Sequence, residues 1–195
     1  MHVRARRRYR EAIGSRQLHP LPGDDVIPDA ALVLDRARAI AAPPEAIWPW
    51  LVQLGKGRAG WYLPRPVERL VPRARRGART LDPRWQALEP GRRIPDYGGH
   101  DAHLEVVTVD PPAALVYRSR RRSAEFSWAL VLEPRGARET VVRLRLRATL
   151  RSRGLRRAAI VALGGLFDRV TSELMLAGLA ERVRAAGGGD RQPGG

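Results

Sequence analysis

The run from Ile40 to Tyr62 constrains the fold more than any other part of this chain, and it reads IAAPPEAIWPWLVQLGKGRAGWY. An apolar segment, residues 32–40, stops just before Pro43 and Pro44, whose fixed φ and missing N–H suit the first turn of a helix. Apolar residues then recur at helical spacing as far as Gly55. The sequence therefore predicts a strand over 32–40 that leads directly into a helix ending before Gly55.

The second half of the chain alternates between strand patterns and turn residues, and then changes to a helical pattern. The predicted strands, separated by proline- and glycine-containing turns, span residues 104–109, 114–120, 125–132 and 140–150. After Gly154, apolar residues recur at steps of three and four up to Gly187, which predicts one long helix. A short helix is expected near 67–71. This order predicts an α+β fold built from an antiparallel meander and a C-terminal helix.

One predicted strand separates its two faces clearly. From Val142 to Leu150, apolar residues alternate with Arg143, Arg145 and Arg147, so one face is expected in the core and the other is lined by arginine. The arginine face has two interpretations: a solvated surface that protects the strands from aggregation, or an anion-binding surface. It lacks the interleaved aromatics that stack nucleic acid bases, so it does not predict an RNA-recognition sheet.

Several of these segments, in this order, resemble the START-like polyketide cyclase and lipid-transport superfamily (SRPBCC), in its bacterial branch with a WPWLVQxG…RxGWY signature. The matching segments are 21–24 (LPGD), 40–62, 85–95, 126–134 and 175–179. Arg92 stands where the family often has Asp. The resemblance implies a helix-grip fold, in which a curved antiparallel sheet wraps around a long C-terminal helix. It also implies a cavity between sheet and helix that binds apolar or amphipathic molecules.

A set of candidate ligand-binding residues follows from this resemblance. Trp61, Tyr62 and Trp85 are expected near the mouth of the cavity, and Arg58 or His100 is expected to orient a polar end of the ligand. The interior lining is expected to comprise Tyr117, Phe126, Trp128, Leu146, Met175 and Leu179. Small residues of the long helix, among them Gly178, are expected to leave part of the space unfilled. The alternative is that the aromatics simply fill an ordinary core.

Catalytic motifs are scarce in this sequence. Asp96 and His100, in the run DYGGHDAH, are the candidates for an acid or base, and an exposed hairpin turn is the alternative. His100 and His103 are three residues apart, a spacing that puts them on opposite faces of a strand, so we expect no metal site. No glycine-rich phosphate loop follows a strand, and we expect no cofactor. Whether the protein is an enzyme stays open.

Composition limits the remaining classes. The chain has no cysteine, which excludes disulfides and thiolate metal sites. Its formal net charge is +16, with Lys56 as the single lysine, a bias that GC-rich coding also produces. We expect a flexible basic segment over residues 1–19, one domain over 20–186 and a disordered tail over 187–195. The chain shows no complete export signal and no apolar run of membrane-spanning length, so we expect a cytoplasmic protein.

Three functions are consistent with these features. The first is the binding of a small hydrophobic or amphipathic molecule in the cavity. The second is a cyclase or dehydrase acting on a polyketide-like or aromatic substrate, with Asp96 or His100 as acid or base. The third is a basic surface, formed by the N-terminal arginines and the arginine face of the sheet, that binds nucleic acid or an anionic lipid membrane.

Overall fold

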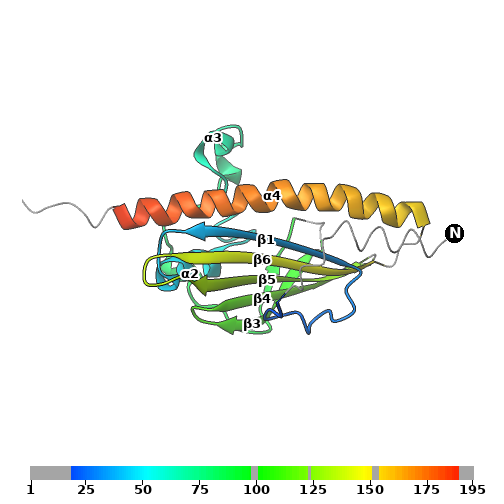
Figure 1. The fold of residues 1–195 in the computed structure, drawn as a ribbon. Helices are drawn as coiled ribbons and strands as arrows, with labels where there is room; N and C mark the ends of the chain where they lie inside the picture. Colours follow the sequence, from blue (N-terminus) through cyan, green and yellow to red (C-terminus); the bar gives the residue numbers. More distant parts are fainter. Residues whose placement is uncertain (1–18, 98–100, 123, 151–153, 189–195) are drawn as a thin grey trace, which may run out of the picture.

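The chain folds into a six-stranded antiparallel sheet with one long helix lying along it (Figure 1). The computed structural model describes residues 19–97, 101–122, 124–150 and 154–188, with the backbone alone for 154–164 and 166. In spatial order the strands are β1 (Leu32–Ile40), β6 (Thr140–Leu150), β5 (Ala124–Pro134), β4 (Ala114–Arg120), β3 (His103–Asp110) and β2 (Arg93–Pro95). The helices are α2 (Pro44–Gln53), α3 (Arg65–Glu68) and α4 (Gly154–Gly188). The α+β helix-grip architecture is confirmed.

Most predicted elements form where the sequence pattern places them. β1 and the strands from β3 to β6 match the alternating segments, α2 begins at Pro44, and α4 follows Gly154. β2 was not predicted, because it is three residues long and only Ile94 within it is buried, too little to show a period. The short helix also begins earlier than expected, at Arg65 directly after Pro64, because Pro66 suits the first turn of a helix.

The main core lies between one face of the sheet and the helices α2 and α4. α4 packs along β1 and β6 and also contacts α2. Side chains from the C-terminal half of α4 are fully buried here, because apolar residues at helical spacing share one face. They are Met175, Leu176 and Leu179.

The opposite face of the sheet is covered by the segment that precedes β1, and it is not the solvated arginine face that the sequence suggests. Leu21 and Val26 of that segment pack on buried apolar residues of β4 and β5. Arg145 is 2% exposed, and its guanidinium binds Asp24 and Asp35 at 2.8 and 2.5 Å. The expectation of an exposed arginine face is therefore wrong for its central residue, because acidic side chains distant in sequence fold over it.

α4 also holds the loop between α2 and β2, and Gly178 makes this contact possible. A Cβ at Gly178 would lie 2.7 Å from backbone atoms of Tyr62 and Leu63. Gly178 thus brings a loop against the helix and does not leave the space that we expected from a small residue. Beside it, Arg182 donates to the backbone oxygens of Leu63 and Gly178.

Within the described ranges, none of the helices combines the length and hydrophobicity that crossing a bilayer requires.

Replacing the buried Arg145 tests the covered sheet face. Arg145→Gln is expected to lower the free energy of unfolding by about 3 kcal/mol, since it leaves two carboxylates close together without their cation. Arg138→Gln, at an exposed position in the turn before β6, is expected to change it by less than about 0.5 kcal/mol. Urea denaturation of both variants measures the difference. Equal stability of the two would mean that the segment before β1 does not cover the sheet.

A glycine pair on α4 tests the loop contact. Gly178→Ala is expected to destabilise the protein by at least about 2 kcal/mol, because the new methyl group has no room beside the loop backbone. Gly187→Ala, with no atom within 4 Å of its added Cβ, is the control. It is expected to be neutral or stabilising by up to about 1 kcal/mol, since alanine favours a helix over glycine. Thermal unfolding measures both, and a stabilising Gly178→Ala would contradict the contact.

Candidate functional site

Three aromatic rings form a continuous stack at the centre of the sheet's inner face. Tyr117, Trp128 and Leu146 are direct neighbours across β4, β5 and β6, so their side chains lie on the same face. The rings of Tyr117 and Trp128 stack with their centroids 5.8 Å apart. Trp61, from the loop after α2, stacks on the other side of Trp128 at 5.7 Å. The structure therefore brings together three of the expected lining residues and Trp61, which was expected at the mouth.

Arg58 lies in a tight turn beside this stack. The turn is closed by a bridge between Gly55 and Gly60, both at positive φ, which glycine adopts without strain. Nη2 of Arg58 donates to the backbone oxygens of Val52, at 3.1 Å, and Trp85, at 2.6 Å. The guanidinium also lies 4.9 Å from the centre of the Trp85 ring. Arg58 thus caps the end of α2 and fixes Trp85.

Two polar atoms in this region are buried without a hydrogen-bond partner among the described residues. They are Nε of Arg58 and the hydroxyl of Tyr117. Burial lowers the pKa of Arg58, and Tyr117 is the largest influence that opposes the shift. Burial likewise raises the pKa of Tyr117 against the influence of Arg58. Each group affects the pKa of the other, so both belong to the same region of the interior. One is a charged N–H donor and the other a neutral O–H donor, and both lack an acceptor among the described residues.

Tyr62 is not at a mouth, as we expected, but inside the core. Its side chain is 0% exposed. The hydroxyl accepts a bond from Gln53 at 3.0 Å and donates to the backbone oxygen of Trp50 at 2.9 Å. Because Trp61 and Tyr62 are consecutive in an extended loop, the two rings point to opposite sides, the first towards the sheet and the second towards α2.

The remaining lining residues divide into a closed part and an accessible part. Met175 and Leu179 are fully buried and fill the space beneath the C-terminal half of α4. Trp85, Phe126 and Leu146 keep partial exposure, as Trp61 does. Arg121 lies over the Phe126 ring at 4.9 Å. These partly exposed residues mark where the region of the aromatic stack meets solvent.

Of the two acid–base candidates, the structure describes only Asp96, whose polar groups are paired. The carboxylate of Asp96 is bound by the guanidinium of Arg121, and the backbone oxygen of Asp96 accepts from Lys56. His100 lies outside the described residues. Across the part of the chain that the structure describes, no cluster of His, Asp and Glu side chains could hold a metal ion.

Two residues that position the site were missed in the sequence. Gln53 is 0% exposed and joins α2 to the segment before β2, since its side chain donates to Tyr62 and accepts from the backbone N–H of Asp82. Arg182 lies 4.5 Å from the Tyr62 ring. Both occupy the apolar face of a helix, where a polar residue signals a buried hydrogen-bond network.

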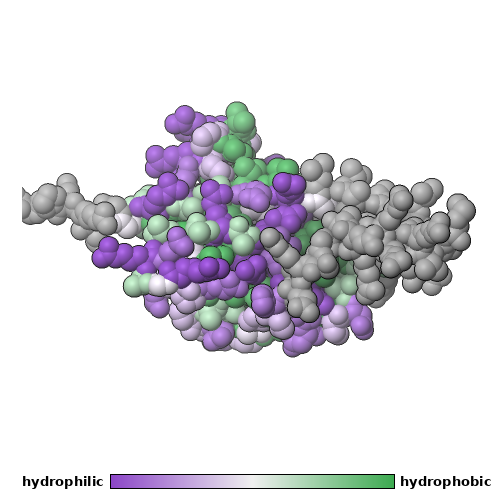
Figure 2. Space-filling model, in the orientation of Figure 1, coloured by the Kyte–Doolittle hydropathy of each residue, from purple (hydrophilic) through white to green (hydrophobic). Residues whose placement is uncertain are grey.

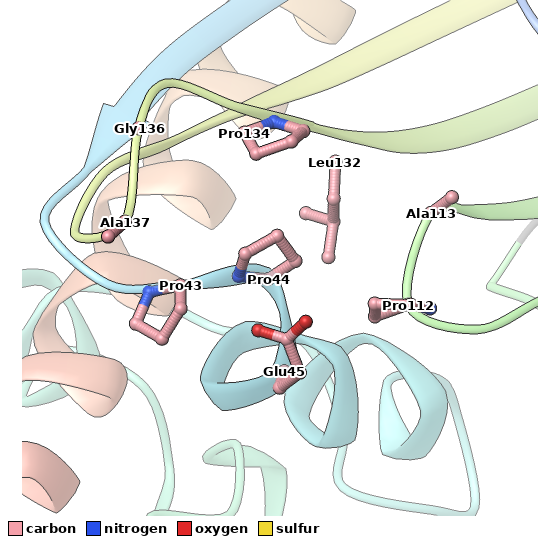
Figure 3. A pocket seen from close by; sticks show the side chains of 9 residues that line it. All are labelled: Pro43, Pro44, Glu45, Pro112, Ala113, Leu132, Pro134, Gly136 and Ala137. Carbon is pink, nitrogen blue, oxygen red and sulfur yellow. The ribbon is translucent and has the colours of Figure 1, made fainter.

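A separate hollow of about 410 Å³ lies at another place, where α2 begins between two turns of the sheet. Its wall is mainly proline and alanine, with the side chain of Leu132 (Figure 3). Figure 3 shows the Glu45 carboxylate between Pro44 and Pro112. The hollow is lined by one charged group and by none of the aromatic rings of the stack, so we do not assign the ligand site to it.

The free energy of unfolding distinguishes the two buried tyrosines. Tyr117→Phe is expected to leave it unchanged or raise it by about 1 kcal/mol, because the hydroxyl that is removed has no partner. Tyr62→Phe is the matched control and is expected to lower it by about 1–3 kcal/mol, because it breaks two buried hydrogen bonds. Guanidinium denaturation compares the two. If both variants lose stability equally, the Tyr117 hydroxyl is hydrogen-bonded in solution.

No protein-family model matches the chain, and no curated protein sequence is similar to it. It does resemble solved structures. They include the ZhuI aromatase/cyclase of Streptomyces sp. R1128, at 13% identity over 78% of this chain and 93% of the other, with a TM-score of 0.49. Norcoclaurine synthase of Thalictrum flavum (15%; 80% and 95%; 0.46) and CalU16 of Micromonospora echinospora (14%; 78% and 84%; 0.46) are further examples. Similarity of this degree is compatible with many functions, and the fold assignment rests on the chain's own topology.

Proposed function

We propose that the protein binds a small hydrophobic or amphipathic molecule, one that carries an oxygen acceptor, between the sheet and α4. The observation that carries the proposal is the pair of unpartnered donors, Nε of Arg58 and the hydroxyl of Tyr117, beside three stacked aromatic rings. A buried polar group without a partner destabilises a protein by about 1–3 kcal/mol. A ligand oxygen between these donors would remove that cost.

The ring stack indicates the shape of the ligand. Trp61, Trp128 and Tyr117 lie within 25° of parallel from one ring to the next. Stacking of this kind favours a flat apolar molecule. Trp61 belongs to a glycine-flanked loop and not to the sheet, so in this proposal its side chain turns aside for entry and then covers the bound molecule. The SRPBCC superfamily, which the sequence resembles, binds apolar molecules in the corresponding region.

Two donors that hold a carbonyl oxygen would also stabilise negative charge developing on it, which is the contribution that an enzyme of the cyclase type needs. Such a reaction additionally needs a proton acceptor. Of the two candidates for it, Asp96 is bound by Arg121, and His100 lies outside the described residues. We therefore propose binding as the function and keep a cyclase or dehydrase activity as the second candidate.

Native mass spectrometry of the purified protein, followed by solvent extraction, is the first experiment. A retained small molecule that is apolar and contains oxygen would support the proposal and identify the ligand class. If the retained molecule carries no acceptor oxygen, the role of the two donors is wrong. Conversion of the extracted molecule on incubation with fresh protein would favour the cyclase alternative.

Binding of anilinonaphthalene sulfonate, which is aromatic and carries acceptor oxygens, provides a quantitative test. Tyr117→Phe is expected to weaken its affinity about fivefold and Arg58→Met about thirtyfold, as for a neutral and a charged hydrogen bond. Trp61→Ala is expected to weaken it by removing the cover over the stack. Leu81→Ala, at a 42% exposed position, is the control and is expected to have no effect. Fluorescence titration gives each affinity.

The unfolding measurement on Tyr117→Phe separates a direct loss of binding from a loss caused by unfolding, because this variant is expected to remain fully folded. Unchanged affinity in both Tyr117→Phe and Trp61→Ala would place the ligand elsewhere and contradict the proposal.

A further inference from the structure

The loop between Trp61 and β2 includes a protrusion, residues 65–76, that projects beyond α4 (Figure 1). It contains α3 and the turn of 3₁₀ helix over Arg73–Arg75. The ligand site does not use it. Its sequence is RPVERLVPRARR, which combines apolar residues and arginines in a short exposed segment.

The protrusion exposes a large apolar side chain at its tip. Leu70 is 86% exposed, more than any other large hydrophobic side chain in the described part of the chain. One flank of the protrusion is hydrophobic in the space-filling view, and hydrophobic surface is also visible on the helix beneath it (Figure 2). α4 exposes Phe167 and Val170, at 72% and 51%. Phe167 and Val170 precede by at least two helical turns Gly178 and Arg182, where α4 contacts the base of the loop, so Leu70 is the apolar group that the protrusion itself offers.

The charges around Leu70 have one sign at the surface. The exposed arginines of the protrusion are Arg65, Arg69, Arg73, Arg75 and Arg76. Its single acid, Glu68, is 5% exposed, and its carboxylate is taken by Arg182 and Arg79 at 2.8 and 2.6 Å. The protrusion therefore presents positive charge around an apolar tip.

The protrusion keeps a defined shape. Its base is tied to α4 through Glu68 and Arg182, and the backbone N–H of Arg65 donates to Glu181 at 2.9 Å. Across its far end, Arg76 donates to the backbone oxygens of Val71 and Arg69. These bonds hold Leu70 away from the body of the protein, so its side chain cannot fold back into the core.

We propose that this protrusion docks the protein on an anionic lipid bilayer. Leu70 enters the interface between headgroups and acyl chains, and Arg69, Arg73 and Arg75 contact lipid phosphates. Interfacial binding combines apolar insertion with attraction to anionic lipid, which are the two properties that the tip offers. A nucleic acid would also attract the arginines, but it has no apolar phase for Leu70, and the protrusion contains no aromatic ring on which a base could stack.

Vesicle flotation with the full chain tests the proposal. The protein is expected to float with vesicles of equimolar phosphatidylcholine and phosphatidylglycerol at low salt, and not with phosphatidylcholine alone. Leu70→Ser is expected to weaken binding about tenfold through loss of the inserted side chain. Replacing Arg69, Arg73 and Arg75 together by Gln is expected to weaken it about a hundredfold, at about fivefold for each charge near the surface.

A matched triple variant controls for net charge. Arg122, Arg135 and Arg138 are exposed in turns of the sheet, and their joint replacement by Gln removes the same charge at another place. It is expected to weaken binding much less than the protrusion triple does. Equal loss in the two triple variants, or unchanged binding in Leu70→Ser, would overturn the proposal.

Insertion itself is measurable because the chain has no cysteine. Leu70→Cys, labelled with a nitrobenzoxadiazole dye, is expected to shift its emission to the blue on anionic vesicles and to be quenched by spin labels within the bilayer. The same dye on Arg135→Cys is expected to show neither change. If the protein binds duplex DNA at low salt through the three arginines while the dye at position 70 reports no insertion, the surface serves nucleic acid and the lipid proposal is wrong.

Discussion

The buried guanidinium of Arg182 holds the loop between α2 and β2 against α4, and both proposed activities depend on that loop. Its side chain is 0% exposed. A buried cation is tolerated only when its donors are matched, and here they are matched by Glu68 and by backbone oxygens. These oxygens belong to Leu63, Gly77, Ala78 and Gly178. Leu63 and Gly77, on either side of the protrusion, are thus both held at α4, and the segment between them projects beyond the helix (Figure 1).

We call the hydrogen bonds of Arg182 to Leu63, Gly77 and Ala78 the clamp, and they enclose residues 64–76. The clamp gives one short segment two different surfaces. Just before the clamp, Trp61 turns inwards and stacks on Trp128, and within it Leu70 faces outwards. Ala78 also donates to the backbone oxygen of Ala59, at 2.7 Å, which joins the return of the segment to the Trp61 loop. A hydrophobic molecule partitions from water into a bilayer. In this chain the tip that we propose to dock on a bilayer and the proposed cover of the ligand site belong to one continuous loop.

The sequence predicted the parts of the structure that depend on local periodicity. The alternation over residues 140–150 placed Leu146 on the core face. Trp128 was expected beside it only from the family resemblance, and the register of the structure pairs the two residues. It could not show that Tyr62 is buried, since the direction of a loop ring is set by what packs on it. Nor could it show that Gly178 receives a loop, because the partner backbone lies more than a hundred residues earlier in the chain. Both features depend on long-range contacts, which the periodicity of the sequence does not encode.

Charged surfaces are also hard to predict from the sequence, because composition gives the number of arginines but not the acidic residues that pair with them. The regular arginine pattern of β6 suggested an anion-binding face, yet Arg143 and Arg145 are paired with Asp35 and further acids at the covered side of the sheet. The run over residues 65–76 has no regular period, so the sequence did not predict an interaction surface there. The single acidic residue of this run, Glu68, pairs with the buried Arg182, so the exposed arginines of the run are not neutralised by it. Positive charge can therefore act on a partner at residues 65–76, because Glu68 is buried and does not neutralise the arginines around it. The regularity of a charge pattern in the sequence does not reveal such a surface.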